Sequence, residues 1–382
     1  MDVTQKGLVT LLRSAITGQA QPLPEGFRLE DGLELTAKHH MAPLIYEGAA
    51  VCGLPLTDPS MGRMFHTYCR AVQVSDGQMA EIARIFAAFE EAGVDYLPLK
   101  GCNMKLRYPK PELRSMGDGD ILIRMAQYDR IRTILEQLGF SFKVESDHEL
   151  IWQSPKLLLE LHKHLIPSYN ADYYAYFGEG WAFAQAGAGH RHDMSPEDEF
   201  VYLFGHFTKH FRDGGIGCRH VVDLWVYLRA CPELDMEKVT AALEKLQLLE
   251  FFGHIRRLID WWFGDGAGDE HLEMISDFIF ASGSWGRMEE KILSWNLRLD
   301  HGRASHLRQT LFPGVGRLKG QYPVLQKAPW LLPAIWAYRP IYKLLFDRRA
   351  VKRQEQKLRV LTRENLQARQ KFLTAVGLQF RQ

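Results

Sequence analysis

The sequence predicts an α+β protein in which a small mixed β-sheet with flanking helices is followed by a helical second domain and a basic helical tail. Three changes of pattern lead to this prediction. Apolar residues recur at helical spacing up to about residue 92, short apolar strands follow between about 94 and 165, and helical spacing returns from Ser195. The chain has 382 residues, of which 46% are hydrophobic, so we expect two or three domains with real cores.

These patterns define four regions. We expect an N-terminal helical region that packs on the sheet, the sheet core, a helical domain, and an aromatic-rich basic tail, at residues 1–92, 93–190, 191–300 and 301–382. The first region closes with an amphipathic segment, 77–92, which Gly93 terminates. The helical domain opens with Ser195-Pro196 and acids in the first turn, a strong signal for a helix start.

The sheet core combines five predicted strands with one crossing helix. The strands are expected at residues 94–101, 119–124, 139–145, 149–154 and 156–164, the third and fourth forming an antiparallel pair. Helical spacing over 126–138 predicts the crossing helix, which Gly139 closes. Pro98 lies within the first strand, and proline suits an edge strand or a strand end.

Two acids precede the apolar run of the second strand. Because side chains alternate along a strand, Asp118 and Asp120 project from one face and Gly119 from the other. Carboxylates this close repel each other unless a cation or bound protons compensate, and Mg²⁺ is commonly held by one or two carboxylates plus phosphates. The alternative is a simple turn before a strand, because Asp-x-Asp alone is a weak motif.

A third acid and a glycine turn favour the metal interpretation. Glu160 interrupts a leucine run on a later strand, where a charge needs a partner. An acid at this place would complete a two-metal clamp for phosphoryl or nucleotidyl transfer. The Lys100-Gly101 turn offers backbone N–H groups that an anion could approach closely, since glycine has no side chain in the way.

The stretch LKGCNMKLRYPKPELRSMGDGDILI, residues 99–123, combines a Lys-Gly turn, a Tyr-Pro step, an Arg, and Asp-x-Asp before an apolar strand. In this order the motif resembles the uncharacterised nucleotidyltransferase family. The segments AKHHMAPLIY, ELHKHL and FGHFTKHFRDGGIGCRHVVDLWVYL also look like family segments in the family order. The resemblance covers roughly residues 30–300. It implies the fold shared with DNA polymerase beta and the aminoglycoside nucleotidyltransferases.

The resemblance implies a role for each residue of the motif. Asp118 and Asp120 would bind Mg²⁺, with Mn²⁺ as the alternative ion. Glu160 would be the third carboxylate and could also act as base for the acceptor hydroxyl. Lys100 and Gly101 would line the triphosphate, Gly101 by its backbone.

Three further residues are expected to contact the substrate. Arg114, on the loop before the aspartates, could pair with phosphate oxygens as a fork donor. Lys209 and His210 belong to a segment that resembles the family, which implies contact with substrate or phosphate; packing or surface placement is the alternative. The sequence also departs from the wider superfamily, which has Gly-Ser at the turn and an apolar residue where this chain has Gly119.

These features predict transfer of a nucleoside monophosphate, AMP favoured, from an NTP such as ATP to a hydroxyl of a small molecule or protein, with release of pyrophosphate. The alternative is a binding or scaffold protein that keeps the fold without the chemistry and acts through its tail. No run is long and apolar enough to span a membrane, and the five cysteines form no CxxC pair. We therefore expect a cytoplasmic protein with reduced cysteines.

The charge of the chain is divided unevenly. Residues 302–382 hold 17 Lys and Arg against three acids, a net charge of +14, whereas the rest of the chain carries −13. A basic, aromatic-rich segment can bind an anionic partner such as nucleic acid or a lipid surface, and the latter would place the protein at a membrane periphery. The alternative is that the tail packs back on the acidic body.

Overall fold

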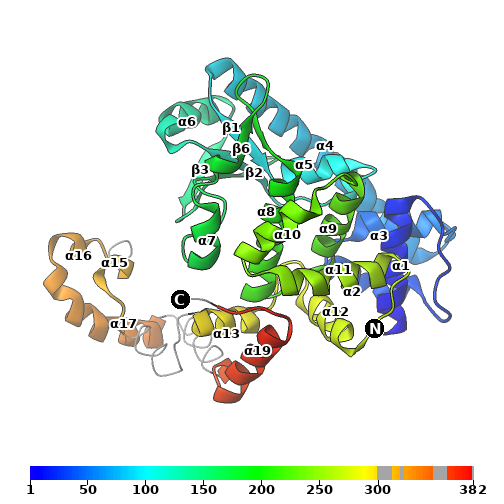
Figure 1. Ribbon diagram of the computed structural model, residues 1–382. Helices are drawn as coiled ribbons and strands as arrows, with labels where there is room; N and C mark the ends of the chain where they lie inside the picture. Colours follow the sequence, from blue (N-terminus) through cyan, green and yellow to red (C-terminus); the bar gives the residue numbers. More distant parts are fainter. Residues whose placement is uncertain (299–311, 319–321, 347–358, 381–382) are drawn as a thin grey trace. The chain divides into compact units, whose positions relative to one another are not determined.

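A computed structural model describes residues 1–298, 312–318, 322–346 and 359–380 (Figure 1). The chain divides into two compact units: Met1–Phe211 with Gly215–Trp285, and Arg212–Gly214 with Gly286–Gln382. The first unit contains the whole sheet and the predicted site residues. Parts of the predicted basic tail lie outside the described residues.

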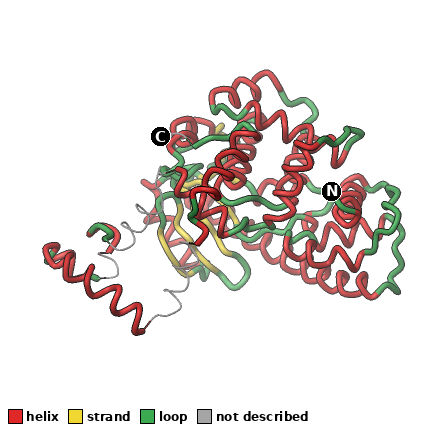
Figure 2. Tube along the Cα trace, turned by 90° about the horizontal axis from the view of Figure 1, so that it is seen from below, coloured by secondary structure: helices red, strands yellow, loops and turns green. Residues whose placement is uncertain are grey.

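The sheet has five strands: β1 (Tyr96–Leu99), β2 (Gly119–Ile123), β3 (Ser141–Glu145), β4 (Glu149–Gln153) and β5 (Leu158–His162). Their order is β1-β2-β5-β4-β3, with β2 and β5 parallel and the other neighbouring pairs antiparallel. The five strands lie together in one group (Figure 2). β1 is an edge strand, as expected for a strand that contains Pro98.

One face of the sheet belongs to the apolar core. Ile121 and Ile123 of β2 lie in this core together with apolar side chains of β1, β4 and β5. Helices α4 (Pro59–Ala92) and α6 (Tyr128–Gln137) supply the opposing layer (Figure 1). Each large apolar side chain buried in this way contributes roughly 1.5–3 kcal/mol. The core therefore fixes which residues of each strand point inward, and the alternate residues must face the other way.

The long helix α4 has signals at both ends. The Asp58 side chain accepts a hydrogen bond from the backbone N–H of Ser60, and Pro59 occupies the first helical position. Gly93 ends the helix with a φ of 68°, as predicted. The predicted amphipathic segment 77–92 is the C-terminal half of this 34-residue helix.

Helices α7 (Ala171–Phe177) and α8 (Pro196–Asp213) belong to the chain that follows the sheet. Phe177 of α7 contacts Tyr202 of α8 edge-on, with ring centroids 6.0 Å apart. Glu199 of α8 accepts a hydrogen bond of 3.1 Å from Asn103, just after β1. These contacts hold α8 close to the end of β1, where the predicted phosphate turn lies.

The first unit contains further helices: α1 (Val3–Thr17), α2 (Leu33–Lys38), α3 (Ala42–Val51), α5 (Gly101–Met104), α9 (Cys218–Ala230), α10 (Met236–Lys245), α11 (Leu249–Phe263) and α12 (Glu270–Ser282). Single 3-10 turns lie at Leu29–Gly32, Lys105–Arg107, Pro111–Leu113, Met125–Gln127 and Trp181–Phe183. Helices α1 and α3 approach closely because Gly48 lacks a side chain: a Cβ there would lie 2.0 Å from the carbonyl oxygen of Leu11.

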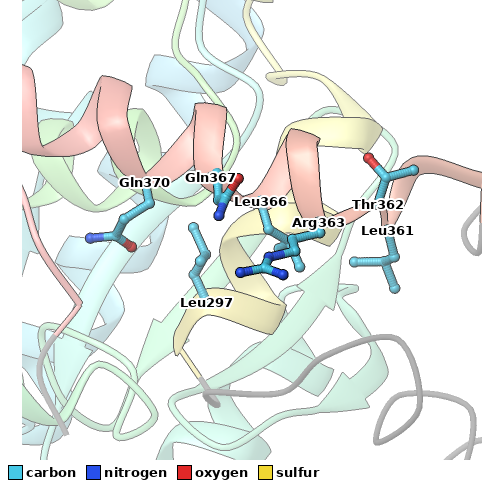
Figure 3. A pocket seen from close by; sticks show the side chains of 7 residues that line it. All are labelled: Leu297, Leu361, Thr362, Arg363, Leu366, Gln367 and Gln370. Carbon is cyan, nitrogen blue, oxygen red and sulfur yellow. The ribbon is translucent and has the colours of Figure 1, made fainter.

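The second unit contains α13 (Met288–Arg298), α15 (Val315–Leu318), α16 (Val324–Lys327), a 3-10 turn at Pro329–Leu331, α17 (Leu332–Phe346) and α19 (Arg363–Ala375). Ile292 and Leu293 of α13 pack with Leu361, which precedes α19. Buried Arg369 of α19 donates to the Ser294 hydroxyl at 3.2 Å and pairs with Glu290 at 3.2 Å. A pocket of about 630 Å³ lies between Leu297 and the start of α19 (Figure 3).

The predicted α+β class is confirmed, and all five expected strands are present. A short hairpin of β6 (Ala184–Ala186) and β7 (His192–Met194) was not expected. The domain borders near 93 and 191 stay predictions, and the border near 301 lies outside the described residues. Among the described residues, no helix combines the length and apolar character that a membrane span requires.

Candidate active site

Strand register brings two acids and a lysine together. Asp120 of β2 lies opposite Glu160 on the parallel neighbour β5, and opposite Leu99 on the antiparallel neighbour β1. Lys100 follows Leu99 directly, so its side chain starts next to Asp120. Asp118 precedes β2, and Gly119 between the two aspartates is buried beside Leu157 of the core face. Asp118, Asp120 and Glu160 therefore share the face of the sheet that turns away from the core.

Lys100 lies in a strained backbone position at the centre of this group. Its φ is 40°, a value that residues with a side chain rarely adopt. The ammonium group lies 2.7 Å from Oδ1 of Asp120 and is largely buried. Such strain often accompanies functional sites, and it turns the Lys100 side chain toward the acids.

His162 completes the group. It lies two residues after Glu160 on β5, on the same face, and is fully buried. Its Nε2–H donates to Oδ1 of Asp120 at 2.9 Å, and Nε2 is 3.8 Å from Oε2 of Glu160. One ligand atom each from Asp120, Glu160 and His162 lies within 4.8 Å of the others. The period of two along β5 is the signal that could have placed His162 in the predicted site.

Burial and neighbouring charges separate the pKa values of the three acids. Burial raises the pKa of Asp118, and the charge of Asp120 raises it further. Burial together with Asp118 and Asp120 raises the pKa of Glu160 to about 8. Burial acts the same way on Asp120, but Lys100 and His162 outweigh it and hold the pKa of Asp120 below its usual range. Asp120 is thus the permanent anion of the group, and Glu160 holds a proton that a bound cation would displace.

Opposite effects act on the bases. Burial would lower the pKa of Lys100, but the charge of Asp120 outweighs it and raises the pKa, so the ammonium remains charged. Burial and the Lys100 charge lower the pKa of His162 to about 4, so its imidazole is neutral. A neutral imidazole is the form that can bind a metal ion.

This donor set fits a divalent cation. Carboxylate oxygens suit Mg²⁺ and Mn²⁺, and an imidazole nitrogen suits Mn²⁺ and later transition metals. The group also has one polar atom without a partner: within the described part of the chain, Nδ1 of His162 is buried and makes no hydrogen bond. Two carboxylates and one imidazole whose ligand atoms lie within 4.8 Å of one another are more than an ordinary sheet surface needs.

Further polar groups surround these residues. Glu149 of β4 lies opposite His162 of β5, and His148 pairs with Glu149 at 2.9 Å. Tyr202 and His206 of α8 lie near Lys100. Burial lowers the pKa of the half-buried His206, and the charge of Lys100 lowers it further. The sequence did not single out Tyr202 or Glu149, because neither belongs to a recognisable local motif.

Arg114 is held by an acid of the helical domain. Its Nε and one terminal nitrogen donate to the two carboxylate oxygens of Asp223 at 2.8 and 3.0 Å, and both side chains are buried. Tyr108 donates to the same carboxylate at 2.7 Å. The other terminal nitrogen of Arg114 faces Gly101, where a Cβ would lie 3.2 Å away. The predicted phosphate contact of Arg114 stays a prediction, and only this nitrogen is turned toward the phosphate turn.

Lys209 and His210 lie on α8, near the group around Lys100. Lys209 is buried, and Nε2 of His210 lies 3.0 Å from Nε2 of His206. Their expected contact with substrate stays a prediction.

A separate pocket of about 520 Å³ lies beside the loop that leads to Asp118. Apolar residues of α2, α3 and α4 form most of its wall, together with Arg63, Arg70 and Ser115. Ser115 donates to the backbone carbonyl of His40 at 2.9 Å, which fixes the loop at the edge of the pocket. Because Ser115 precedes Asp118 by three residues, their Cα atoms are at most about 11 Å apart.

Acids on the adjoining parallel strands β2 and β5, beside a glycine turn after β1, have the arrangement that the sequence motif led us to expect of a nucleotidyltransferase. The chain belongs to the family described as uncharacterised nucleotidyltransferase, whose sequence pattern matches residues 26–264, more than half of the chain. The family predicted from the motif is thereby confirmed, and membership assigns the chain to the enzymes that transfer a nucleotidyl group.

Comparison with solved structures found two matches. One is the solution structure of the antibiotic-resistance factor ANT(2'')-Ia, with 18% identity and a TM-score of 0.33, covering 44% of this chain and 90% of that one. The other is the crystal structure of ANT(2")-Ia in complex with adenylyl-2"-tobramycin, with 16% identity and a TM-score of 0.32, covering 44% and 95%. No curated protein matches the sequence.

Proposed function

We propose that this protein transfers a nucleoside monophosphate, AMP favoured, from an NTP to a hydroxyl group of a small molecule or protein. The observation that carries the proposal is the placement of Asp120 opposite Glu160, with Asp118 and Lys100 beside them. Asp118, Asp120 and Glu160 would hold Mg²⁺ or Mn²⁺, which supplies positive charge to the triphosphate and to the leaving pyrophosphate.

The chain's own residues would then perform the following steps. Lys100 would exchange its contact with Asp120 for one with the triphosphate, whose charge is larger. Gly101 would let the phosphates approach the backbone. Glu160, once the cation has displaced its proton, would accept the proton of the acceptor hydroxyl. The acceptor oxygen forms a bond to the α-phosphorus, and the bond between that phosphorus and the oxygen bridging to the β-phosphate breaks, releasing pyrophosphate.

The 520 Å³ pocket beside Ser115 is the best-supported place for the acceptor. Its wall is mainly apolar, and the exposed Arg63 and Arg70 stand one above the other on α4. An acceptor with an apolar body and an acidic group would fit this lining. This favours a small molecule over a protein side chain.

The nucleotide site is tested by isothermal titration of each NTP, with and without Mg²⁺, against the wild type and the double variant Asp118→Asn, Asp120→Asn. We expect Mg²⁺-dependent binding that the double variant loses by about 100-fold or more, a loss typical for groups that stabilise phosphate charge. Glu136→Gln removes an exposed acid of α6 and serves as control. Equal binding by the double variant would refute the proposal.

A second candidate function concerns the basic tail. Trp330, Tyr338 and Tyr342 are 75%, 52% and 44% exposed, and they are spaced eight and four residues apart along α17 and the turn before it. Exposed aromatics beside basic residues suit an anionic lipid surface. Flotation with phosphatidylserine vesicles should carry the wild type at low salt, and the triple alanine variant of these aromatics should remain in solution. Equal flotation of both would remove this candidate.

A further inference from the structure

His162 has the geometry of a metal ligand. Two donors about 2.1 Å from one ion are about 3.0 Å apart when they are neighbours in an octahedron and at most about 4.2 Å apart when they are opposite. Nε2 of His162 lies 2.9 Å from Oδ1 of Asp120 and 3.8 Å from Oε2 of Glu160. Both distances fall within the range that a single ion can span.

The position of His162 is fixed by the fold. β5 presents Glu160 and His162 on one face, and β2 presents Asp120 beside them through the parallel register. His162 is fully buried, so its ring has little freedom to turn away. A histidine that only completed the core would not need three ionisable groups, Asp120, Glu160 and Lys100, close to its ring.

The other ring nitrogen is the alternative place for the imidazole proton. In the described part of the chain Nδ1 is buried without a hydrogen-bond partner. A bound ion would therefore displace the Nε2–H hydrogen bond to Asp120, and the single proton of the neutral imidazole would lie on Nδ1. Ion binding through Nε2 gives a reason for keeping an imidazole at a place where leucine, as in the neighbouring positions of β5, would leave no polar atom unpaired.

We propose that Nε2 of His162 is a direct ligand of the catalytic ion, together with Asp120 and Glu160, and that it makes the site prefer Mn²⁺ over Mg²⁺. This inference rests on the proposed nucleotidyl-transfer function. Mg²⁺ strongly favours oxygen donors, whereas Mn²⁺ accepts an imidazole nitrogen, and the affinity of mixed nitrogen and oxygen sites rises along the first transition series. His162 is then the residue that determines which ion the site takes.

The test is pulsed electron paramagnetic resonance of the full chain loaded with Mn²⁺, without nucleotide. Wild-type protein should show coupling of Mn²⁺ to one imidazole ¹⁴N, and protein grown with ¹⁵N-histidine should show the ¹⁵N pattern instead. His162→Gln should lose the coupling, and its Mn²⁺-over-Mg²⁺ preference, measured by titration of each ion, should fall about tenfold. His164→Gln, two residues further along and near Asp147, should keep both.

The outcomes separate this inference from the proposed function. Mn²⁺ bound without nitrogen coupling would overturn the role of His162 and leave the acidic site intact. Absence of Mn²⁺ binding, with or without NTP, would overturn both. The isotope label needs no substitution, so the coupling in wild-type protein decides the question even if His162→Gln fails to fold; the coupling must then persist in His148→Gln, the other histidine whose ring is within 6 Å of His162.

Discussion

Lys100 donates a hydrogen bond to Oδ1 of Asp120, an oxygen atom that a bound cation would also need. Its ammonium lies 2.7 Å from Oδ1 of Asp120 and is held there by a strained backbone. In the absence of nucleotide, the lysine and the metal ion therefore compete for the same charge. In the proposed reaction the triphosphate would offer Lys100 a partner of larger charge, so that the lysine and the metal ion could bind together.

We therefore expect Lys100→Met to change two affinities in opposite directions. The affinity for Mn²⁺ alone should rise about tenfold, equivalent to roughly 1.4 kcal/mol of relieved repulsion, whereas the affinity for Mn²⁺-NTP should fall. Titration calorimetry of the ion and of the ion-nucleotide complex measures both. Lys110→Met, an exposed lysine paired with Glu47, is the control and should change neither. A fall in both affinities would show that Lys100 does not compete with the ion.

Two glycines of the motif differ in what surrounds them. A Cβ on Gly119 would lie 3.4 Å from Leu157 and 3.7 Å from the sulfur of Cys102, which are ordinary contact distances. A Cβ on Gly101 would lie 2.8 Å from the sulfur of Met116, which is too close without movement. A small side chain could thus replace Gly119 without a clash, whereas a side chain at Gly101 would force Met116 to move.

Alanine substitutions should separate these glycines. We expect Gly119→Ala to raise the free energy of unfolding by about 0.5 kcal/mol, since a strand glycine costs backbone entropy. Gly101→Ala should lower it by about 1 kcal/mol and weaken NTP binding, because Met116 and Arg114 must move. Urea unfolding measures the free energy of unfolding of both variants, and titration measures the NTP binding of Gly101→Ala. A lower free energy of unfolding for Gly119→Ala would mean that Leu157 cannot move enough to accommodate the added methyl group.

The loop between β1 and β2 is held in place by the helical domain. Asp223 of α9 accepts hydrogen bonds from Arg114 and Tyr108, and Arg219 donates to the carbonyl of Ser115 at 2.5 Å. Because this loop ends at Asp118, its anchoring determines where the first acid of the site lies. The element that orients the site is thus α9, about a hundred residues later in the chain.

Asp223→Ala should therefore be strongly destabilising. It leaves the guanidinium of Arg114 buried without its acid, a change that costs about 3–5 kcal/mol. The double variant Arg114→Met, Asp223→Leu removes both charges and should regain a large part of that loss. Urea unfolding of Arg114→Met, of Asp223→Leu and of the double variant completes the cycle. Additive losses in the double variant would show that the pair is not coupled.

The strands and helices near the site could be predicted because each carries its own periodic pattern. The strand pair at 139–145 and 149–154, the edge position of Pro98 and the acids Asp118, Asp120 and Glu160 all follow from local sequence. The neighbours of these acids could not be predicted with the same certainty. The parallel pairing of β2 with β5, and the contact of Arg114 with Asp223, depend on segments far apart in the chain, and one sequence records no such contact.

Contacts between distant segments, which one sequence does not record, also hold the first compact unit together. Changes of periodicity mark where helices give way to strands, so they predict borders such as 93 and 191. Compact units depend instead on contacts between distant segments, and His39 shows how such contacts are made. Its Nδ1 accepts a hydrogen bond from the backbone N–H of Cys218 at 3.1 Å, and its Nε2–H donates to the carbonyl of Phe280 at 3.1 Å.

These two hydrogen bonds of His39 should make the stability of the first unit depend on pH. Burial lowers the pKa of His39 to about 4, with Lys38 and His40 acting in the same direction, whereas a histidine in the unfolded chain has a pKa near 6.5. Between these two pH values the unfolded chain binds more protons than the folded one. The contribution of neutral His39 to the free energy of unfolding is therefore fully present above pH 6.5 and is lost as the pH falls toward 4. The expected loss is about 3 kcal/mol.

His39→Gln should remove this part of the pH dependence. A glutamine cannot take up a proton, so the variant should be less stable at pH 7.5 yet lose about 3 kcal/mol less than the wild type between pH 6.5 and 4. Urea unfolding at steps of pH measures the two slopes, and His66→Gln, an exposed histidine of α4, should follow the wild type. Equal slopes for His39→Gln and wild type would mean that acid acts on another group. A reduced slope would identify His39, whose ring connects the N-terminal helices to α9 and α12, as a group through which acid destabilises the first unit.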